Sequence, residues 1–285
     1  MLRLAVTTRA ETFDRIRDPL EKRGVRAEHV QTDERTLPLT RGFERSFDVG
    51  FVYPSRTMEG GVFDALLDVP WVNDREAVLT SRNKAGVYAA LSKAGVPVPE
   101  TTLVSNPVDE AAIREAAAAF EYPVVVKPNS TTRGVGVTKV GDADSLSGVT
   151  DYLSLVHDYR ATGDKSFLVQ EYLPAARDYR AMVVDGEFVG AVERRLPADG
   201  DRWKHNVHRG AQAVGVDLPA RHRRLAERTA DVLDVRYLGV DLLETDERVV
   251  VNETNARPTV DEATKYEPDF YDRLAALIKE TAERR

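Results

Sequence analysis

The segment 237–258 constrains the fold of this chain more than any other part of the sequence. Two β-rich runs flank a short polar turn at 245–248, and this pattern predicts an antiparallel hairpin. On the second run Glu253 and Asn255 stand two residues apart, so both lie on the same face of the strand. Asp241 lies on the first run. The register of the hairpin therefore decides whether three oxygen-bearing side chains converge.

The length of the loop sets that register. A three-residue loop, 246–248, places Asp241 opposite Glu253, whereas a two-residue loop pairs Asp241 with Asn252 and separates the cluster. Carboxylate and amide oxygens suit a hard cation such as Mg²⁺, which usually bridges nucleotide phosphates in such sites. A solvated strand end is the commoner setting for a single acidic residue. Because polar residues here interrupt an apolar strand directly after three valines, we favour a metal site of Asp241, Glu253 and Asn255.

Composition excludes several classes of protein. The chain has 285 residues, 42% hydrophobic and 31% charged, as expected of a globular protein with a sizeable core. Its net charge of −7 argues against nucleic acid as a partner. The absence of cysteine excludes thiol nucleophiles, disulfides and zinc–thiolate sites. No apolar run reaches membrane-spanning length, so we expect a soluble cytoplasmic protein without a membrane partner.

Strands and helices alternate over the first 75 residues, which predicts a small α/β unit with a parallel sheet. The pattern changes near residue 80, and we divide the chain into 1–79, 80–166 and 167–285. Ser81 is expected to cap a helix over 82–94. The other expected helices are 11–23, 62–67, 109–121, 144–159, 219–235 and 268–283, and the expected strands are 2–8, 25–31, 47–53, 71–73, 122–128, 137–140, 167–172, 179–184 and 187–194.

A buried strand that ends at Lys127 leads into a loop of small residues, 130–136. Such a loop can fold its N–H groups over a polyphosphate while the lysine contacts it. The loop matches neither the P-loop nor the dinucleotide fingerprint, and an ordinary hairpin explains it equally well. Lys84 lies in the first turn of its expected helix, where the helix dipole disfavours a cation; a nearby anion explains this placement, and a solvated lysine is the alternative.

Three further segments carry polar side chains that could form a binding site. The strand end at 170–173 can present backbone groups to an adenine edge or be a plain strand. Arg180 and Arg194 can bind a phosphate or carboxylate in one cleft, or form an exposed salt-bridged face. His205 and His208 lack further histidine or cysteine partners, so we do not expect a zinc site there.

The order of these segments resembles the series found in ATP-grasp ligases, and the chain looks most like the RimK-type branch. The resemblance runs from about residue 73 to about residue 261. It implies an α/β (α+β) fold, in which an N-terminal Rossmann-like pre-ATP-grasp unit precedes two α+β lobes that hold nucleotide between them. The motifs that carry it are Ser81-Arg82-Asn83-Lys84, the Val124–Gly136 segment, Gln170-Glu171-Tyr172, Asp178-Tyr179-Arg180, Glu193-Arg194-Arg195, Asn206-Val207-His208-Arg209-Gly210, Gly239-Val240-Asp241 and Asn252-Glu253-Thr254-Asn255.

The resemblance implies a role for individual residues of these motifs. Those that would contact ATP are Lys84, Lys127, Ser130, Arg133, Gly134, Gly136, Gln170, Glu171, Tyr172, Leu173, Asp178, Lys204 and Asn206, with the 130–136 loop closing as a lid. Those that would stabilise the anionic intermediate are Arg180, Arg194 and Arg209. Those that would hold Mg²⁺, or Mn²⁺ in its place, are Asp241, Glu253 and Asn255.

The activity that the resemblance implies is Mg·ATP-dependent ligation of an amine, such as glutamate, to a carboxylate through an acylphosphate. Its partners would be a small-molecule carboxylate and an amino acid. A protein C-terminal tail as acceptor and a non-catalytic ATP-binding sensor or scaffold are the alternatives, and a homo-oligomer is left open. The chain departs from the usual family pattern at 256–259, at 132–133 and at 208–211, and these departures leave the substrates undetermined.

Overall fold

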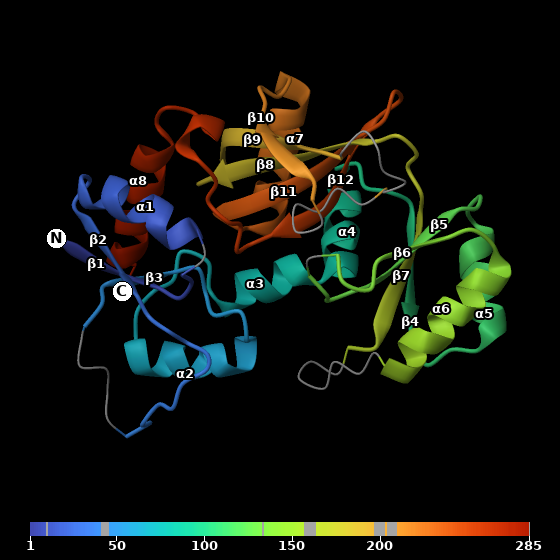
Figure 1. The fold of residues 1–285 in the computed structure, drawn as a ribbon, viewed down its shortest axis with the longest axis horizontal. Helices are drawn as coiled ribbons and strands as arrows, with labels where there is room; N and C mark the ends of the chain where they lie inside the picture. Colours follow the sequence, from blue (N-terminus) through green and yellow to red (C-terminus); the bar gives the residue numbers. More distant parts are fainter. Residues whose placement is uncertain are drawn as a thin grey trace.

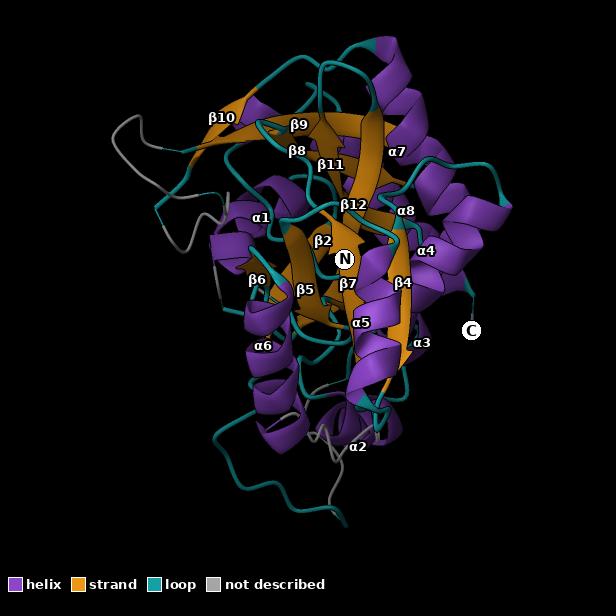
Figure 2. Ribbon diagram, turned by 90° about the vertical axis from the view of Figure 1, so that its right-hand side faces the viewer, coloured by secondary structure: helices purple, strands orange, loops and turns teal. Residues whose placement is uncertain are grey.

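The computed structural model describes residues 1–9, 11–40, 46–132, 134–156, 164–196, 203 and 210–284 (Figure 1). Within these residues the strands form a three-stranded, a four-stranded and a five-stranded sheet. The three sheets lie at different places along the molecule, with helices packed against each (Figures 1 and 2). No helix in the described part of the chain is both long enough and apolar enough to cross a membrane.

The N-terminal sheet is parallel and has the strand order β2-β1-β3, which confirms the parallel α/β unit expected from the sequence. The expected strand at 71–73 is reduced to one bridge between Gly50 and Trp71. The C-terminal helix α8 packs against α1 and β3, so the two ends of the sequence share one core. These elements are β1 (Leu2–Val6), α1 (Glu11–Glu21), β2 (Val25–His29), β3 (Val49–Phe51), α2 (Thr57–Leu67) and α8 (Phe270–Glu283).

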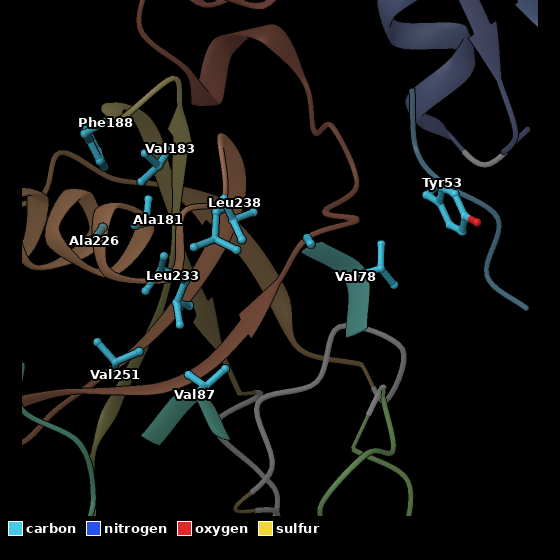
Figure 3. Close-up of a cluster of buried hydrophobic side chains, with 14 of the residues drawn as sticks. Tyr53, Val78, Val87, Ala181, Val183, Phe188, Ala226, Leu233, Leu238 and Val251 are labelled. Carbon is cyan, nitrogen blue, oxygen red and sulfur yellow. The ribbon is translucent and has the colours of Figure 1, made fainter. Parts of the chain in front are cut away.

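The five-stranded sheet, which we call the large-lobe sheet, is antiparallel and has the order β10-β9-β8-β11-β12. Helix α7 covers one of its faces with residues at helical spacing; Ala226 and Leu233 lie beside Ala181 and Leu238 of the sheet (Figure 3). The elements of this lobe are β8 (Arg177–Val184), β9 (Glu187–Arg195), β10 (Gln212–Gly215), α7 (Ala220–Leu233), β11 (Tyr237–Glu244) and β12 (Val249–Asn255). The short 3₁₀ helix η2 (Ala263–Lys265) packs near β9 and β10.

The four-stranded sheet, which we call the small-lobe sheet, is also antiparallel and has the order β4-β7-β5-β6. Helices α5 and α6 cover it and enclose a separate apolar core. Strand β7 belongs to this sheet, although the division expected at 166/167 assigns it to the C-terminal lobe; the domain division itself stays a prediction. The elements of this lobe are β4 (Thr101–Ser105), α5 (Glu110–Ala118), β5 (Val124–Pro128), β6 (Thr138–Val140), α6 (Ala143–Val156) and β7 (Ser166–Glu171).

The expectation of one helix over 82–94 capped by Ser81 is wrong. Two helices meet there, α3 (Arg75–Arg82) and α4 (Lys84–Lys93), and Asn83 caps the second by accepting a hydrogen bond from the Gly86 N–H at 3.1 Å. Ser81 is buried inside α3, where its hydroxyl accepts the Ala256 N–H at 3.0 Å. The prediction failed because the hydroxyl contacts the distant β12 end rather than its own helix.

Candidate functional site

The hairpin of β11 and β12 pairs Asp241 with Glu253, as the preferred register predicts. The loop that joins the two strands is longer than the expected three residues. The loop has four residues, Thr245–Arg248, closed by a Thr245 N–H bond to the Arg248 carbonyl at 2.8 Å. A register shift next to Asp241 leaves Asn252 as an extra residue, and this bulge restores the pairing. Without it, Asp241 would face Asn252.

A cavity of about 360 Å³ lies between the small-lobe and large-lobe sheets. This volume falls within the usual range for a small-molecule site. Its walls combine two lysines, one arginine, four carboxylates and an apolar end. The residues that line it are Lys84, Val125, Lys127, Thr131, Gly134, Val137, Gln170, Glu171, Tyr172, Leu173, Ala175, Ala176, Asp178, Arg194, Leu196, Trp203, Asp241, Leu243, Asn252 and Glu253.

Lys127 reaches the cavity from the end of β5, and its side chain is buried. Its ammonium donates to the Tyr88 hydroxyl at 2.7 Å and to the Asn252 amide oxygen at 3.4 Å. Burial lowers the pKa of the ammonium to about 8, against a weaker opposing effect of Glu253. An ammonium in this position gains from any anion that enters the cavity.

Lys84 is the first residue of α4 and is also buried, so the expected conflict with the helix dipole is present. Its ammonium lies 3.4 Å from the Glu253 carboxylate and donates to the backbone carbonyls of Asn129 and Thr131. Burial lowers its pKa, and Glu253 acts in the opposite direction. Two buried lysines, at the start of a helix and the end of a strand, thus line one cavity.

The carboxylates of the site are tied to arginines in a buried network. Arg180 donates two hydrogen bonds to Asp241, at 2.7 and 2.8 Å. Arg194 bridges Asp241 at 2.9 Å and Asp178 at 2.5 Å. Burial acts to raise the pKa of Asp241, but the charges of Arg180 and Arg194 outweigh it, so the pKa lies below its usual value. Asp241 is therefore ionised at neutral pH.

The donor set fits a divalent cation only in part. Glu253 is 30% exposed and contacts Lys84 at 3.4 Å, which leaves carboxylate capacity for a metal. Asp241 accepts three arginine hydrogen bonds; since a carboxylate offers about four lone-pair positions, one is left for a cation. Asn255 does not line the cavity, and its amide oxygen accepts the Arg257 N–H at 2.9 Å. Among the described residues, no three His, Cys, Asp or Glu side chains are placed so that together they could hold a metal ion.

The expected adenine segment lies at the apolar end of the cavity. The Glu171 carboxylate accepts from the Glu100 N–H at 2.7 Å and from Arg248 of the hairpin loop at 2.5 Å. This carboxylate therefore joins the small-lobe sheet to the hairpin. The backbone between Glu171 and Leu173 remains the polar surface that this segment offers to a ligand.

The loop after β5 folds back on the strand. Gly136 has φ +76°, and a Cβ there would lie 2.7 Å from Pro128 Cγ, so a larger residue is excluded on two grounds. Gly134 also has positive φ and lines the cavity. The Ser130 hydroxyl is buried without a hydrogen-bond partner in the described structure. An unpaired buried hydroxyl is costly, and a ligand oxygen would satisfy it.

The structure places some of the expected site residues in the wall of the cavity and others away from it. Those that line the cavity are Lys84, Lys127, Gly134, Gln170, Glu171, Tyr172, Leu173, Asp178, Arg194, Asp241 and Glu253. Those that do not line it are Ser130, Gly136, Arg180 and Asn255. Those that lie outside the described residues are Arg133, Lys204, Asn206 and Arg209.

Sequence reasoning missed Tyr88, which accepts a hydrogen bond from the Lys127 ammonium, and the wall residues Asn252 and Trp203. Tyr88 could have been found, because it stands four residues after Lys84 and so shares one face of α4. Asn252 reaches the site through the bulge, and Trp203 through tertiary folding. No local sequence pattern predicts that Asn252 or Trp203 lies at the site.

The amino-acid sequence is similar to that of known ligases over about two thirds of its length. It is 32% identical over 198 residues to a probable alpha-L-glutamate ligase of Enterobacter sp. (strain 638), a match covering 69% of this chain and 62% of that protein. It is 30% identical over 198 residues, with the same coverage of both proteins, to a ribosomal protein bS6–L-glutamate ligase of Escherichia coli. The match thus spans less than two thirds of the length of either relative.

The fold is similar to that of solved ATP-grasp proteins along its whole length. A RimK domain protein of Sphaerobacter thermophilus gives a TM-score of 0.66 at 24% identity, covering 99% of this chain and 98% of that one. A D-alanine–D-alanine ligase of Bacillus anthracis complexed with ATP gives 0.70 at 17% identity, covering 100% and 98%. A sequence model described as the RimK-like ATP-grasp domain matches residues 81–277, and the chain therefore belongs to that family, as its motifs predicted.

Proposed function

We propose that this protein is an Mg·ATP-dependent carboxylate–amine ligase. One observation carries the proposal: the buried ammonium groups of Lys84 and Lys127 line the same cavity as the carboxylates Asp241 and Glu253. Two desolvated lysines favour a polyanionic ligand, while the paired carboxylates suit the cation that accompanies it.

The proposed reaction proceeds in two steps. The substrate carboxylate attacks the γ-phosphorus of ATP, giving an acylphosphate and ADP. An amine then attacks the acyl carbon, and the tetrahedral intermediate expels inorganic phosphate and leaves an amide. Neither step requires a covalent nucleophile from the protein, so positioning and electrostatic stabilisation suffice.

The residues that line the cavity would have different roles in these two steps. Lys84 and Lys127 offset the negative charge on the transferred phosphoryl group. Mg²⁺, bound through Glu253 and the free position on Asp241, would supply a Lewis acid to the phosphate oxygens. Arg194 lines the cavity while holding Asp178 and Asp241, so it can stabilise an oxyanion without moving from its buried pairs.

We propose glutamate or a similar amino acid as the amine and a carboxylate as acceptor. The names of the two glutamate-ligase relatives support this choice of amino acid. A protein C-terminal tail is a second candidate acceptor, because one relative is named for ligating glutamate to ribosomal protein bS6. Mass shifts in multiples of one glutamate residue on a cellular protein would identify a tail as acceptor.

The proposal is tested by ADP release on incubation with Mg·ATP, pooled amino acids and pooled carboxylates, with mass spectrometry of the products. We expect ADP and a new amide in equal amounts, both lost in Glu253→Gln. ATP binding without ADP release in any substrate pool would favour a non-catalytic nucleotide sensor or scaffold instead.

A further inference from the structure

The buried hydroxyl of Tyr88 connects three elements that surround the cavity. Tyr88 lies on α4, and its hydroxyl accepts a hydrogen bond from the Lys127 ammonium of β5 at 2.7 Å. The same hydroxyl donates to the backbone carbonyl of Asn252 on β12. Burial raises the pKa of the hydroxyl, so at neutral pH it keeps the one proton that this donation uses. Tyr88 does not line the cavity, so it acts on a ligand only through its neighbours.

Asn252 is the residue that the bulge adds to β12. The register of the hairpin places Asp241 opposite Glu253 and leaves Asn252 as the extra residue. A bulge disrupts the hydrogen-bonded ladder and leaves its extra residue unpaired. Tyr88 supplies a donor for the carbonyl of this residue, and Lys127 supplies one for its amide oxygen, at 3.4 Å. The bulge is therefore held from outside the large-lobe sheet, by α4 and β5.

Helix α4 reaches β12 at two positions that lie about one helical turn apart. Lys84 and Tyr88 are four residues apart and share one face of the helix. The Lys84 ammonium lies 3.4 Å from the carboxylate of Glu253, the next residue after the bulge. Val87 of α4 and Val251 of β12 are buried in one apolar core, which fixes the helix against the strand (Figure 3). The helix therefore holds both the bulge and the carboxylate that follows it.

The bulge decides whether the two carboxylates of the hairpin converge. With the bulge, Asp241 faces Glu253. Without it, Asp241 would face Asn252, and the Glu253 side chain would point to the other face of the sheet. A buried carbonyl without a donor costs free energy, so a donor that satisfies the carbonyl of the extra residue favours the bulged register.

We propose that Tyr88 is a positioning residue whose hydroxyl stabilises the Asn252 bulge. It thereby keeps Asp241 and Glu253 together as metal ligands. The same hydroxyl orients the Lys127 ammonium, so one group serves both the metal and the phosphate positions. The proposal rests on the proposed function in one respect, namely that these carboxylates and this lysine bind Mg·ATP. Loss of the hydroxyl should therefore weaken nucleotide binding more in the presence of Mg²⁺ than in its absence.

Hydrogen–deuterium exchange of the nucleotide-free protein tests the contact itself. Tyr88→Phe keeps the ring and removes only the hydroxyl. We expect the amides of β12 to exchange about 5-fold faster, the scale of one lost hydrogen bond, while those of β1 and β3 change by less than about 2-fold. Tyr53→Phe removes a buried hydroxyl in the N-terminal core and is the matched control, in which β12 should exchange as in the wild type. Unchanged exchange in β12 of Tyr88→Phe, or equal acceleration along the whole chain, would overturn the proposal.

Calorimetric titration with ATP, in Mg²⁺ and in EDTA, tests the consequence for the site. Tyr88→Phe should weaken ATP binding by about 10-fold with Mg²⁺ and by about 3-fold in EDTA, where only the effect on Lys127 remains. Tyr53→Phe should keep both affinities within about 2-fold of the wild type. A purely structural role of Tyr88 would lower the two affinities by the same factor, so equal losses would refute the positioning role.

The outcomes of these assays separate this inference from the proposed function. Faster exchange in β12 and a larger loss of ATP affinity with Mg²⁺, together with no ligation by the wild type, would refute the proposed function alone. Ligation by the wild type, together with unchanged exchange and unchanged Mg²⁺ dependence in Tyr88→Phe, would refute this inference alone.

Discussion

Replacing Lys127 by methionine should stabilise the nucleotide-free protein while impairing its function. Methionine has nearly the length of lysine and no charge, so it can fill the same space at the end of β5. The ammonium is buried beside Tyr88 and Asn252, and burial lowers its pKa from 10.5 to about 8. The folded state therefore disfavours the charged form relative to the unfolded chain.

The size of the effect follows from that pKa. At 1.36 kcal/mol per pH unit, the fall from 10.5 to about 8 corresponds to about 3 kcal/mol. Losing the hydrogen bond to Tyr88 offsets about 1 kcal/mol. We expect the free energy of unfolding of Lys127→Met to exceed that of the wild type by about 1–3 kcal/mol at pH 7.

The difference should depend on pH with a defined sign. Below pH 8 the lysine is protonated in both states, and the full cost of burying its charge is present. Between pH 8 and 10.5 the unfolded chain binds more protons than the folded protein, so the stability of the wild type rises with pH. The advantage of Lys127→Met should therefore shrink through this window.

Urea denaturation at pH 7 and pH 10 measures both effects, with the exposed Lys93→Met as control, for which we expect changes within about 0.5 kcal/mol. Calorimetry should show ATP binding to Lys127→Met weakened by about 1–3 kcal/mol, the scale of a charge-assisted hydrogen bond. A variant less stable than the wild type at pH 7, or a difference that does not change with pH, would refute the reasoning.

Three further substitutions test other parts of the site. Glu253→Ala should abolish turnover in an ADP-release assay. It should change the free energy of unfolding by less than about 1 kcal/mol, since the side chain is 30% exposed. Near-normal turnover would contradict the proposed role of Glu253 as a metal ligand. Arg194→Met should lower the free energy of unfolding by about 3–5 kcal/mol, because it removes one arginine partner from each of the buried carboxylates Asp178 and Asp241. If urea denaturation shows that the free energy of unfolding falls by less than about 1 kcal/mol, the network does not have this role. Arg133→Ala should raise the ratio of ATP hydrolysed to amide formed, if the 130–136 loop shields an acylphosphate from water, and an unchanged ratio would argue for a static loop.

The sequence predicted the strands of both lobe sheets better than the contacts between them. The pairing of Asp241 with Glu253 was predicted, since only that register brings the polar side chains together. The bulge that produces it was not, because an extra residue in a strand leaves the alternation of apolar and polar residues ambiguous. The short strands β4 and β10 were also missed, since their pairing partners are distant in the sequence.

The candidate site was predictable where its chemistry is local. A nearby anion was one of two explanations for the positions of Lys84 and Lys127, and both residues line the cavity. The pairing of Asp241 with two arginines was not predictable, because it depends on side chains from three neighbouring strands. Trp203 carried no local signal for the same reason, since its ring partners come from other elements.

The central claim, ligation through an acylphosphate, is tested most directly by isotope transfer. The protein is incubated with Mg·ATP, glutamate as the amine and a pool of acceptors, among them peptides with a C-terminal glutamate, whose carboxylate oxygens are ¹⁸O. Attack of the carboxylate on the γ-phosphorus carries one labelled oxygen into the phosphate that the amine later expels. Mass spectrometry should therefore find one ¹⁸O in the inorganic phosphate, in amounts equal to ADP and amide. Amide formed together with unlabelled phosphate, or with AMP and pyrophosphate, would contradict the account.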